Sequence, residues 1–207
     1  RIAMVFQDPA ASLNPVFTVG EQVVRMVRQH TSLSPQEAAG HALAMFEAVA
    51  LPEPRQIFRS YPHELSGGMQ QRVMIAMALS CGAELLIADE PTTALDVTIQ
   101  AQILALLADL RRKQGVSILL ITHNLGVVAE TCDRVAVAYA GRVVEMGRVE
   151  DVLFRPQHPY TRGLLGALPR PGQARESLES IPGSVPDGLS PPRGCPFAPR
   201  CRDALDA

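Results

Sequence analysis

The sequence predicts an α/β fold with a mostly parallel sheet covered by helices. Two short apolar runs, Leu85–Ala88 and Ser117–Ile121, are typical of buried strands, and a helix-like pattern follows each. The 207 residues are 47% hydrophobic and 19% charged, with a net charge of -2, as in a globular protein with a core. No apolar run reaches the ~18 residues of a membrane span. The near-neutral charge gives no bulk attraction to nucleic acid.

The first part of the chain predicts one strand and then a helical region. Arg1–Gln7 is an apolar run that predicts a short buried strand ending at Gln7, after which Asp8-Pro9 begins a loop. Residues 10–80 are predicted to be mainly helical. The clearest helix starts at Ser34, because Ser-Pro-Gln-Glu combines an N-cap, a proline at the first helical position and a glutamate three residues later. We expect that helix to continue to about Ala50.

The middle of the chain alternates strands and helices. A helix capped by Asp96 follows the first apolar strand, and a short helix over about 125–131 follows the second. Two further strands, 135–139 and 142–146, are joined at Ala140-Gly141. This alternation favours a doubly covered, mostly parallel sheet.

The cysteines divide into two groups. Cys81 and Cys132 lie in apolar, helix-like segments and are predicted to be buried free thiols. Cys195 and Cys201 form a C-x5-C pair in residues 169–201, a proline-rich stretch without periodicity that predicts a loop-rich extension. Nothing in this pattern requires an oxidising compartment, so we expect a cytoplasmic protein.

Two adjacent carboxylates, Asp89 and Glu90, end the first apolar strand. Parallel α/β sheets bind ligands at the carboxyl ends of their strands. One carboxylate can hold Mg²⁺ there, while its neighbour, which faces the other way, can orient or deprotonate a water. The alternative is a solvated strand end. Two carboxylates after a wholly apolar strand favour the functional interpretation.

Three other features could also contact a ligand, one at the start of a helix and two at the ends of strands. Ser66-Gly67-Gly68 opens a helix. Its backbone N–H groups and the Ser66 hydroxyl can bond to a phosphate, and the two glycines have no side chains that would block the approach. A plain N-cap with a glycine turn is the alternative, and the tripeptide alone would favour it. His123 follows the strand at 117–121 and could contact a phosphate or a water, although a lone histidine is more often structural. Gln7 also ends a predicted strand.

Together these features resemble the nucleotide-binding subunit of ATP-binding-cassette (ABC) transporters. Their order and spacing agree with that family over residues 1 to about 150. The matching segments are Gln7 (Q-loop), Leu65–Gln70 (signature), Leu85–Glu90 (Walker B), Ala94-Leu95-Asp96 (D-loop) and His123 (switch histidine).

The C-terminal residues resemble a narrower group. His158–Leu165, Ile181-Pro182-Gly183 and Gly194–Cys201 are similar to the extension of oligopeptide and dipeptide importer ATPases. The resemblance implies a P-loop NTPase-type sheet with a helical subdomain at about 10–80. It implies an ABC ATPase domain over 1–155 that lacks its N-terminal Walker A part, and a truncated extension over 156–207.

The resemblance assigns catalysis and metal binding to the strand ends. Glu90 would be the general base on the attacking water, and His123 would contact the γ-phosphate. Asp89 would hold Mg²⁺ through water. Gln7 would contribute to the Mg²⁺ site and the water and would report occupancy of the site to the membrane partner.

The resemblance also assigns nucleotide contacts. In a head-to-tail pair of subunits, Ser66, Gly67, Gly68 and Gln70 would belong to the signature that closes over the ATP held by the other subunit. Asp96 would couple the two sites across the interface. The expected ligands are therefore ATP and Mg²⁺.

The function implied is ATP hydrolysis that powers a membrane importer of di- or oligopeptides. The implied partners are transmembrane permease subunits, a second ATP-binding subunit in a homo- or heterodimer and, indirectly, an extracytoplasmic solute-binding protein. Nucleic acid is not expected. The protein would be peripheral, at the cytoplasmic face of the inner or plasma membrane. A soluble ABC ATPase of DNA repair or translation, an importer of nickel or glutathione, and a non-catalytic docking module stay open.

Two departures from the family pattern stand out. Met69 occupies a signature position where many members have glutamine, and no G-x-x-x-x-G-K-[ST] motif occurs, since the only lysine, Lys113, ends a helix. The sequence also starts at Arg1, directly on a strand-like run, so we expect a truncated chain whose Walker A motif precedes residue 1. We expect such a fragment to bind ATP weakly or not at all and to be inactive alone.

The C-x5-C pair leaves two interpretations open. Cys195 and Cys201 are either plain thiols or half of a four-cysteine iron–sulfur or metal site in the full-length protein. For the 207 residues alone, no stable site is expected.

Overall fold

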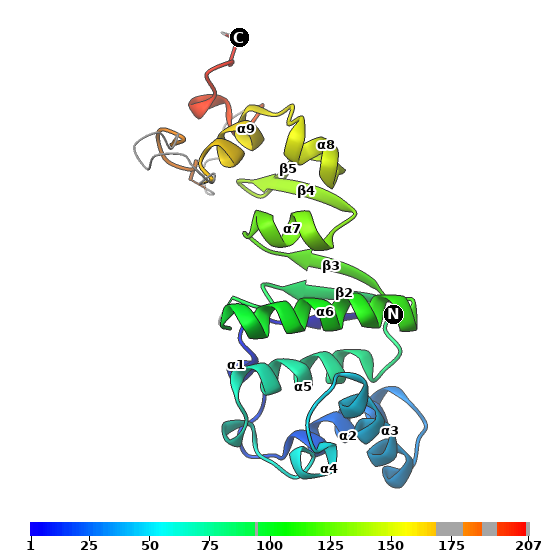
Figure 1. Ribbon diagram of the computed structural model, residues 1–207. Coiled ribbons are helices and arrows are strands. Elements are labelled where there is room, and N and C mark those ends of the chain that lie inside the picture. Colours follow the sequence, from blue (N-terminus) through cyan, green and yellow to red (C-terminus); the bar gives the residue numbers. More distant parts are fainter. Residues whose placement is uncertain (94, 169–179, 188–193, 206–207) are drawn as a thin grey trace. The chain divides into compact units, whose positions relative to one another are not determined.

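The computed structural model describes residues 1–93, 95–168, 180–187 and 194–205. The chain forms two compact units, Arg1–His123 and Asn124–Ala207 (Figure 1). The boundary expected near residue 155 divides the chain differently and stays a prediction. Much of the loop-rich stretch predicted over 169–201 lies outside the described residues.

A three-stranded parallel sheet forms the centre of the first unit. Its strands, in spatial order, are β1 (Ile2–Val5), β2 (Leu85–Asp89) and β3 (Ser117–Ile121). The arrowheads of β2 and β3 point the same way in Figure 1. The predicted parallel sheet is thus confirmed. Its strands pair in register, so that all three carboxyl ends reach one edge.

Only one face of this sheet is fully buried. Val5, Leu86 and Ala88 are at most 1% exposed on the face that packs against helices α5 (Gly67–Leu79) and α6 (Val97–Gln114). The opposite face is largely accessible. Its most exposed side chains are Ile2 (70%), Leu119 (51%), Ile121 (45%) and Met4 (38%).

The expectation of a doubly covered sheet is therefore wrong for that face. The strand predicted over residues 1–7 ends at Val5, and of its four residues only Val5 is buried. The apolar runs predicted burial on both faces because the sequence of a strand shows only which side chains are apolar enough to be buried. It does not state whether a covering element is present.

The helical region predicted over 10–80 is confirmed. The helix expected at Ser34 starts there with a capping box, in which Ser34 and Glu37 satisfy each other's backbone N–H, and it ends at Ala48 rather than Ala50. Thr18 and Glu21 cap the preceding helix in the same way. The elements are α1 (Pro9–Ser12), α2 (Val19–His30), α3 (Pro35–Ala48), α4 (Pro54–Ile57), a 3-10 turn η1 (Pro62–Glu64) and α5.

The second unit contains a β-hairpin and short helices. The two strands predicted over 135–139 and 142–146 are β4 (Arg134–Tyr139) and β5 (Arg142–Arg148). They pair antiparallel, and Ala140 and Gly141 link them with positive φ angles of 47° and 76°. Positive φ at both positions is typical of a type I′ hairpin turn. The other elements are α7 (Leu125–Thr131), α8 (Val149–Phe154), α9 (Pro159–Gly166) and a 3-10 turn η3 (Ala198–Arg200).

The C-terminal segments that resemble importer ATPases pack together. The rings of Tyr139, Tyr160 and Phe197 lie 4.6–5.4 Å apart. Arg200 donates hydrogen bonds to the carbonyls of Pro182 (2.7 Å) and Ile181 (2.9 Å) and to the Tyr139 hydroxyl (3.1 Å). The aromatic cluster, in which Tyr139 and Phe197 are buried, and Arg200 thus join these C-terminal segments to β4.

Cys81 and Cys132 are free thiols, as predicted, but both are half-buried rather than buried. Their apolar neighbours in sequence therefore overstated the burial. In the described residues, no helix is both long and apolar enough to cross a bilayer.

Close packing at Gly20 gives a test of the helical layer. Gly20 of α2 donates its N–H to the Phe58 carbonyl (3.1 Å), and a Cβ at Gly20 would lie 2.4 Å from that oxygen. We predict that Gly20→Ala lowers the free energy of unfolding by about 1–3 kcal/mol, because the backbone of Phe58 must move.

The matched control is Gly40→Ala in α3, where a Cβ would meet nothing within 4 Å. It should raise stability by about 0.5–1 kcal/mol through helix propensity. Urea unfolding followed by circular dichroism measures both variants, and equal effects would contradict the packing argument.

Candidate catalytic site

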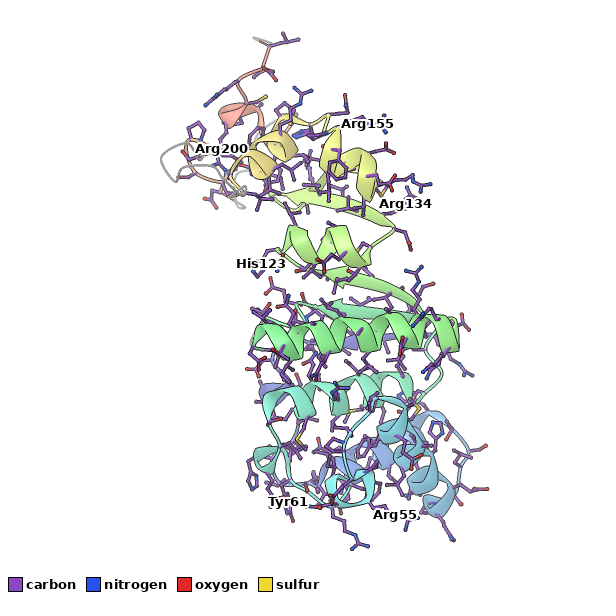
Figure 2. The ribbon with its side chains drawn as sticks, in the orientation of Figure 1. Arg55, Tyr61, His123, Arg134, Arg155 and Arg200 are labelled. Atoms are coloured by element: carbon purple, nitrogen blue, oxygen red, sulfur yellow. The ribbon has the colours of Figure 1, made fainter. Side chains whose placement is uncertain are left out.

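Three strand ends converge on one carboxylate. Gln7 follows β1, Glu90 follows β2 and His123 follows β3, and the parallel register brings these positions to one edge of the sheet. Gln7 Nε2 donates to Glu90 Oε2 at 2.9 Å, and His123 Nδ1 lies 2.9 Å from Glu90 Oε1. His123 is labelled beyond the end of β3 in Figure 2. The structure thus brings together three residues that were predicted separately.

The environment of Glu90 favours its ionised form. The hydrogen bond from His123 is the largest effect that lowers the pKa of Glu90, and a hydrogen bond from Thr93 adds to it, against a smaller opposing effect of burial. The side chain of Glu90 is 24% exposed and that of His123 is 72% exposed. A carboxylate can only accept, so Nδ1 of His123 carries the proton between them.

Thr93 belongs to this network, and the sequence analysis did not single it out. Its Oγ1 donates to Glu90 Oε2 at 2.8 Å, and its N–H donates to the Glu90 carbonyl at 3.2 Å. The sequence contained a signal for this contact. Glu90-Pro91-Thr92-Thr93 has proline at the second position of a four-residue turn, which brings the first and fourth residues together.

The oxygen atoms at this edge suit Mg²⁺. Asp89 is the last residue of β2 and pairs with Ile121 of β3. Gln7 directs its Nε2 toward Glu90, which leaves its amide oxygen to act as a ligand. The described residues contain no group of three or more His, Cys, Asp or Glu that could hold a metal. A single carboxylate completed by an amide, water and phosphate oxygens is a donor set that Mg²⁺ accepts.

The Ser66-Gly67-Gly68 turn forms the start of α5, as predicted. Ser66 is the N-cap, and its Oγ accepts from Met69 N at 3.4 Å. The first N–H groups of the helix have no partner within it. A Cβ at Gly68 would lie 2.7 Å from Ile99 Cγ2 of α6. Gly68 therefore packs closely inside the chain, which is a reason for glycine that does not depend on a phosphate.

Gln70 and Asp96 both bond to their own backbone surroundings. The Gln70 amide donates to the carbonyls of Pro62 (2.8 Å) and Leu65 (3.2 Å), so it holds the loop that enters the signature turn. Asp96 caps α6 as predicted, with Oδ1 accepting from Ile99 N at 2.9 Å. Ala94, part of the expected D-loop, lies outside the described residues.

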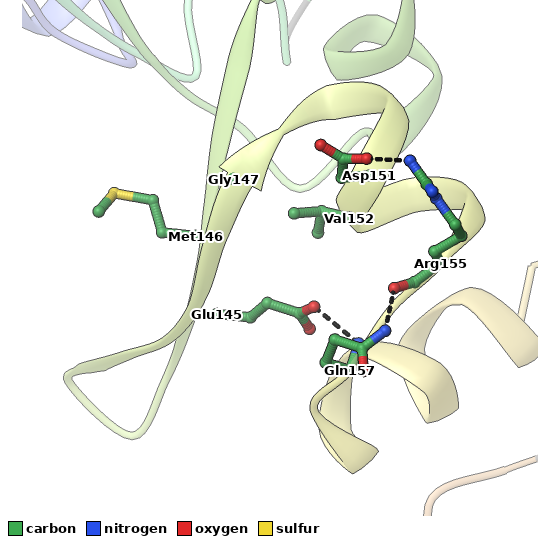
Figure 3. A pocket seen from close by; sticks show the side chains of 7 residues that line it. All are labelled: Glu145, Met146, Gly147, Asp151, Val152, Arg155 and Gln157. Atoms are coloured by element: carbon green, nitrogen blue, oxygen red, sulfur yellow. Dashed lines mark hydrogen bonds and ion pairs between the residues drawn. The ribbon is translucent and has the colours of Figure 1, made fainter.

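The second unit has a separate polar pocket of about 360 Å³ (Figure 3). Glu145 projects toward Gln157 in this pocket, and its carboxylate accepts from the backbone N–H groups of Gln157 (2.7 Å) and His158 (3.1 Å). Asp151 forms an ion pair with Arg155. None of these side chains was predicted as a site residue. Their bonds within the unit position the segment that starts α9.

The C-x5-C cysteines are both free in the structure. Cys195 is exposed, Cys201 is half-buried, and Cys195 Sγ lies 3.8 Å from His158 Nε2. The iron–sulfur interpretation stays a prediction about the full-length protein.

Comparisons with known proteins show the family and the fold to which this chain is similar. The family model described as "ABC transporter" matches residues 1–93, and the one described as "Oligopeptide/dipeptide transporter, C-terminal region" matches residues 144–207. Among solved structures, the ATP-binding cassette MJ0796 bound to ADP and Pi matches with a TM-score of 0.62 and 30% identity, over 72% of this chain and 63% of that one. The cbiO1 protein from Clostridium perfringens matches with a TM-score of 0.66 and 29% identity, over 74% and 59%.

The fold and the matches to solved structures indicate an ATP-binding-cassette domain. The chain is 54% identical to the dipeptide transport ATP-binding protein DppD of Bacillus subtilis, over 99% of its residues and 61% of that protein. It is 53% identical to the oligopeptide transport ATP-binding protein OppD of Salmonella typhimurium, over 100% of its residues and 62% of that protein. The chain belongs to the family of ABC transporter ATP-binding proteins, in its oligopeptide/dipeptide group. It spans about 61–62% of the length of these two relatives.

The contact between His123 and Glu90 predicts a titration effect. In the folded protein the pKa of Glu90 lies below its ordinary value, chiefly because of His123. The stabilisation is therefore fully present above the unfolded pKa and is lost as the pH falls through the folded pKa. We predict that His123→Ala moves the pKa of Glu90 upward, as measured by carbon NMR of the carboxyl group.

Glu37 provides an internal control for this titration. Its pKa is also lowered, but by the hydrogen bonds from Ser34 at the start of α3. It should titrate identically in the wild type and in His123→Ala. A Glu90 titration that does not move in the variant would show that the contact with His123 is absent in solution.

Proposed function

We propose that this protein is the ATP-hydrolysing subunit of a membrane importer for di- or oligopeptides. The observation that carries the proposal is the convergence of Gln7, Glu90 and His123 at the carboxyl edge of the parallel sheet. Ligands bind at this edge in open α/β sheets. The relatives named above as dipeptide and oligopeptide transport ATP-binding proteins support the substrate class.

Glu90 is suited to act as the general base. Its carboxylate is ionised at neutral pH because three donors stabilise the charge. As the oxygen of a water attacks the γ-phosphorus of ATP, one O–H bond of that water breaks and the proton passes to Glu90, while ADP leaves. Phosphoryl transfer needs positioning and charge stabilisation more than covalent participation by the protein.

His123 is suited to hold both the base and the nucleotide. Since Nδ1 faces Glu90, a contact of the ring with a γ-phosphate oxygen uses Nε2. His123 would therefore link Glu90 to the nucleotide, with Nδ1 toward the carboxylate and Nε2 toward the γ-phosphate.

Asp89 and the amide oxygen of Gln7 would hold Mg²⁺, directly or through water. The ion would supply positive charge that neutralises the phosphates of the nucleotide. Ser66, Gly67 and Gly68 would contact the ATP of a second subunit through the free N–H groups of α5 and the Ser66 hydroxyl. Gln70 and Asp96 would act by holding the segments that carry these contacts.

The proposed assembly is a pair of ATP-binding subunits on transmembrane permease subunits, at the cytoplasmic face of the membrane. The helical layer of α2, α3 and α5 is the part proposed to dock on the permease. A solute-binding protein would deliver peptide on the other side. No phosphate-binding G-x-x-x-x-G-K-[ST] motif occurs in these 207 residues, so the test of activity uses the complete gene product.

The decisive experiment compares ATP hydrolysis by the complete gene product with its Glu90→Gln variant, both assembled with the partner subunits. We predict that kcat falls about 100-fold or more, because the amide keeps the shape of the side chain but cannot take a proton. Steady-state phosphate release at saturating ATP measures the effect.

Glu84→Gln is the matched control. Glu84 precedes the same strand at its opposite end, and its side chain is 84% exposed. This variant should hydrolyse ATP like the wild type. Hydrolysis that persists in Glu90→Gln would rule out Glu90 as the base.

A further inference from the structure

We propose that Thr93 is a positioning residue for the catalytic base, because its hydroxyl fixes one oxygen of the Glu90 carboxylate and leaves the other oxygen to take the proton. The inference rests on the proposed function, since it takes Glu90 as the base. No motif of the sequence analysis assigned a role to Thr93.

The hydrogen bonds are distributed unequally over the two carboxylate oxygens. Among the described residues, Oε2 accepts from Gln7 Nε2 (2.9 Å) and from Thr93 Oγ1 (2.8 Å), whereas Oε1 faces His123 Nδ1 (2.9 Å). An ionised carboxylate has about two acceptor sites on each oxygen. Both sites of Oε2 are therefore occupied, and Oε1 keeps one site for a water.

The backbone explains why Thr93 reaches this oxygen. Glu90 has a left-handed φ of 43°, which is unusual for a residue other than glycine, and its N–H donates to the Ile121 carbonyl of β3 at 2.9 Å. Pro91 is buried and fixes the next φ. The turn then closes when Thr93 N–H donates to the Glu90 carbonyl. The position of the hydroxyl is thus built into the turn that follows the strand.

The side chain at position 93 also restricts the geometry. Threonine is branched at Cβ, which limits χ1 and keeps the hydroxyl aimed in few directions. Thr93 is exposed, so burial does not account for its bond to Glu90. A serine can make the same hydrogen bond with more rotational freedom. A valine keeps the branched shape and loses the donor.

The proton balance assigns no transfer to Thr93. When the water attacks the γ-phosphorus, its proton moves to Oε1, and Oε2 becomes the carbonyl oxygen of the neutral acid. Gln7 and Thr93 continue to donate to Oε2 before and after the transfer. The role of Thr93 is therefore to orient the carboxylate.

The test measures kcat against pH for the complete gene product assembled with its partner subunits. Thr93→Val should lower kcat near neutral pH by roughly tenfold and move the acid limb of the profile to higher pH, because the lost donor raises the pKa of Glu90. Thr93→Ser should recover most of both effects. A merely structural role would not move the pH profile.

Thr31→Val is the matched control. Its hydroxyl also makes a 2.8 Å hydrogen bond, to the Val27 carbonyl at the end of α2. The variant should leave both kcat and the pH profile unchanged. A Thr93→Val enzyme that matches the wild type in both readouts would overturn the proposal. So would a Thr93→Ser enzyme as impaired as Thr93→Val, because shape rather than the hydroxyl would then be required.

Carbon NMR of the Glu90 carboxyl group separates this proposal from the proposed function. If Glu90→Gln keeps full hydrolysis, Glu90 is not the base and the proposed mechanism fails. The upward shift of the Glu90 titration in Thr93→Val still decides whether the hydrogen bond exists. If Thr93→Val does not fold, Thr93→Ala and Thr93→Ser provide the same comparison.

Discussion

The parallel register of three strands is the constraint on which this site depends. Because β1, β2 and β3 run the same way and pair residue by residue, Gln7, Glu90 and His123 leave the sheet at one edge although up to 116 positions separate them in sequence. An antiparallel β1 or β3 would send its polar residue to the opposite edge. The hydrogen bonds to Glu90 are therefore a consequence of sheet topology, and the local turn at Glu90 refines them.

The same architecture links the signature turn to the segment after Glu90. The start of α5 lies so close to α6 that a Cβ at Gly68 would overlap Ile99, and a Cβ at Gly67 would touch Leu95. Asp96 fixes the first turn of α6, and Thr93 stands three residues before it on the chain. If α5 moved toward α6, the start of α5 would therefore press directly on Leu95 and Ile99. Glycine at these two positions is therefore explained by packing as well as by the proposed approach of a phosphate.

Local patterns predicted the elements well and the environment of the strands less well. Ser34 and Asp96 were recognisable caps because capping depends on residues a few positions apart. The face with Leu119 and Ile121 was expected to be buried and is exposed, since burial depends on what else packs there. Within the site, Glu90 and His123 were predicted because each is a polar residue that follows an apolar strand. The contact of Thr93 needed the turn geometry, although the Glu-Pro sequence indicated that turn.

The network around Glu90 balances basicity against orientation. Each donor to the carboxylate lowers its affinity for a proton, so a base with three donors is a weaker base than a free glutamate. The same donors remove rotational freedom from a side chain that, as the proposed base, would have to meet a water in one direction. They also keep it ionised at neutral pH, ready to accept. Among the described residues, two donors lie on Oε2 and one on Oε1, so both oxygens lose basicity, and the oxygen beside His123 keeps an acceptor site.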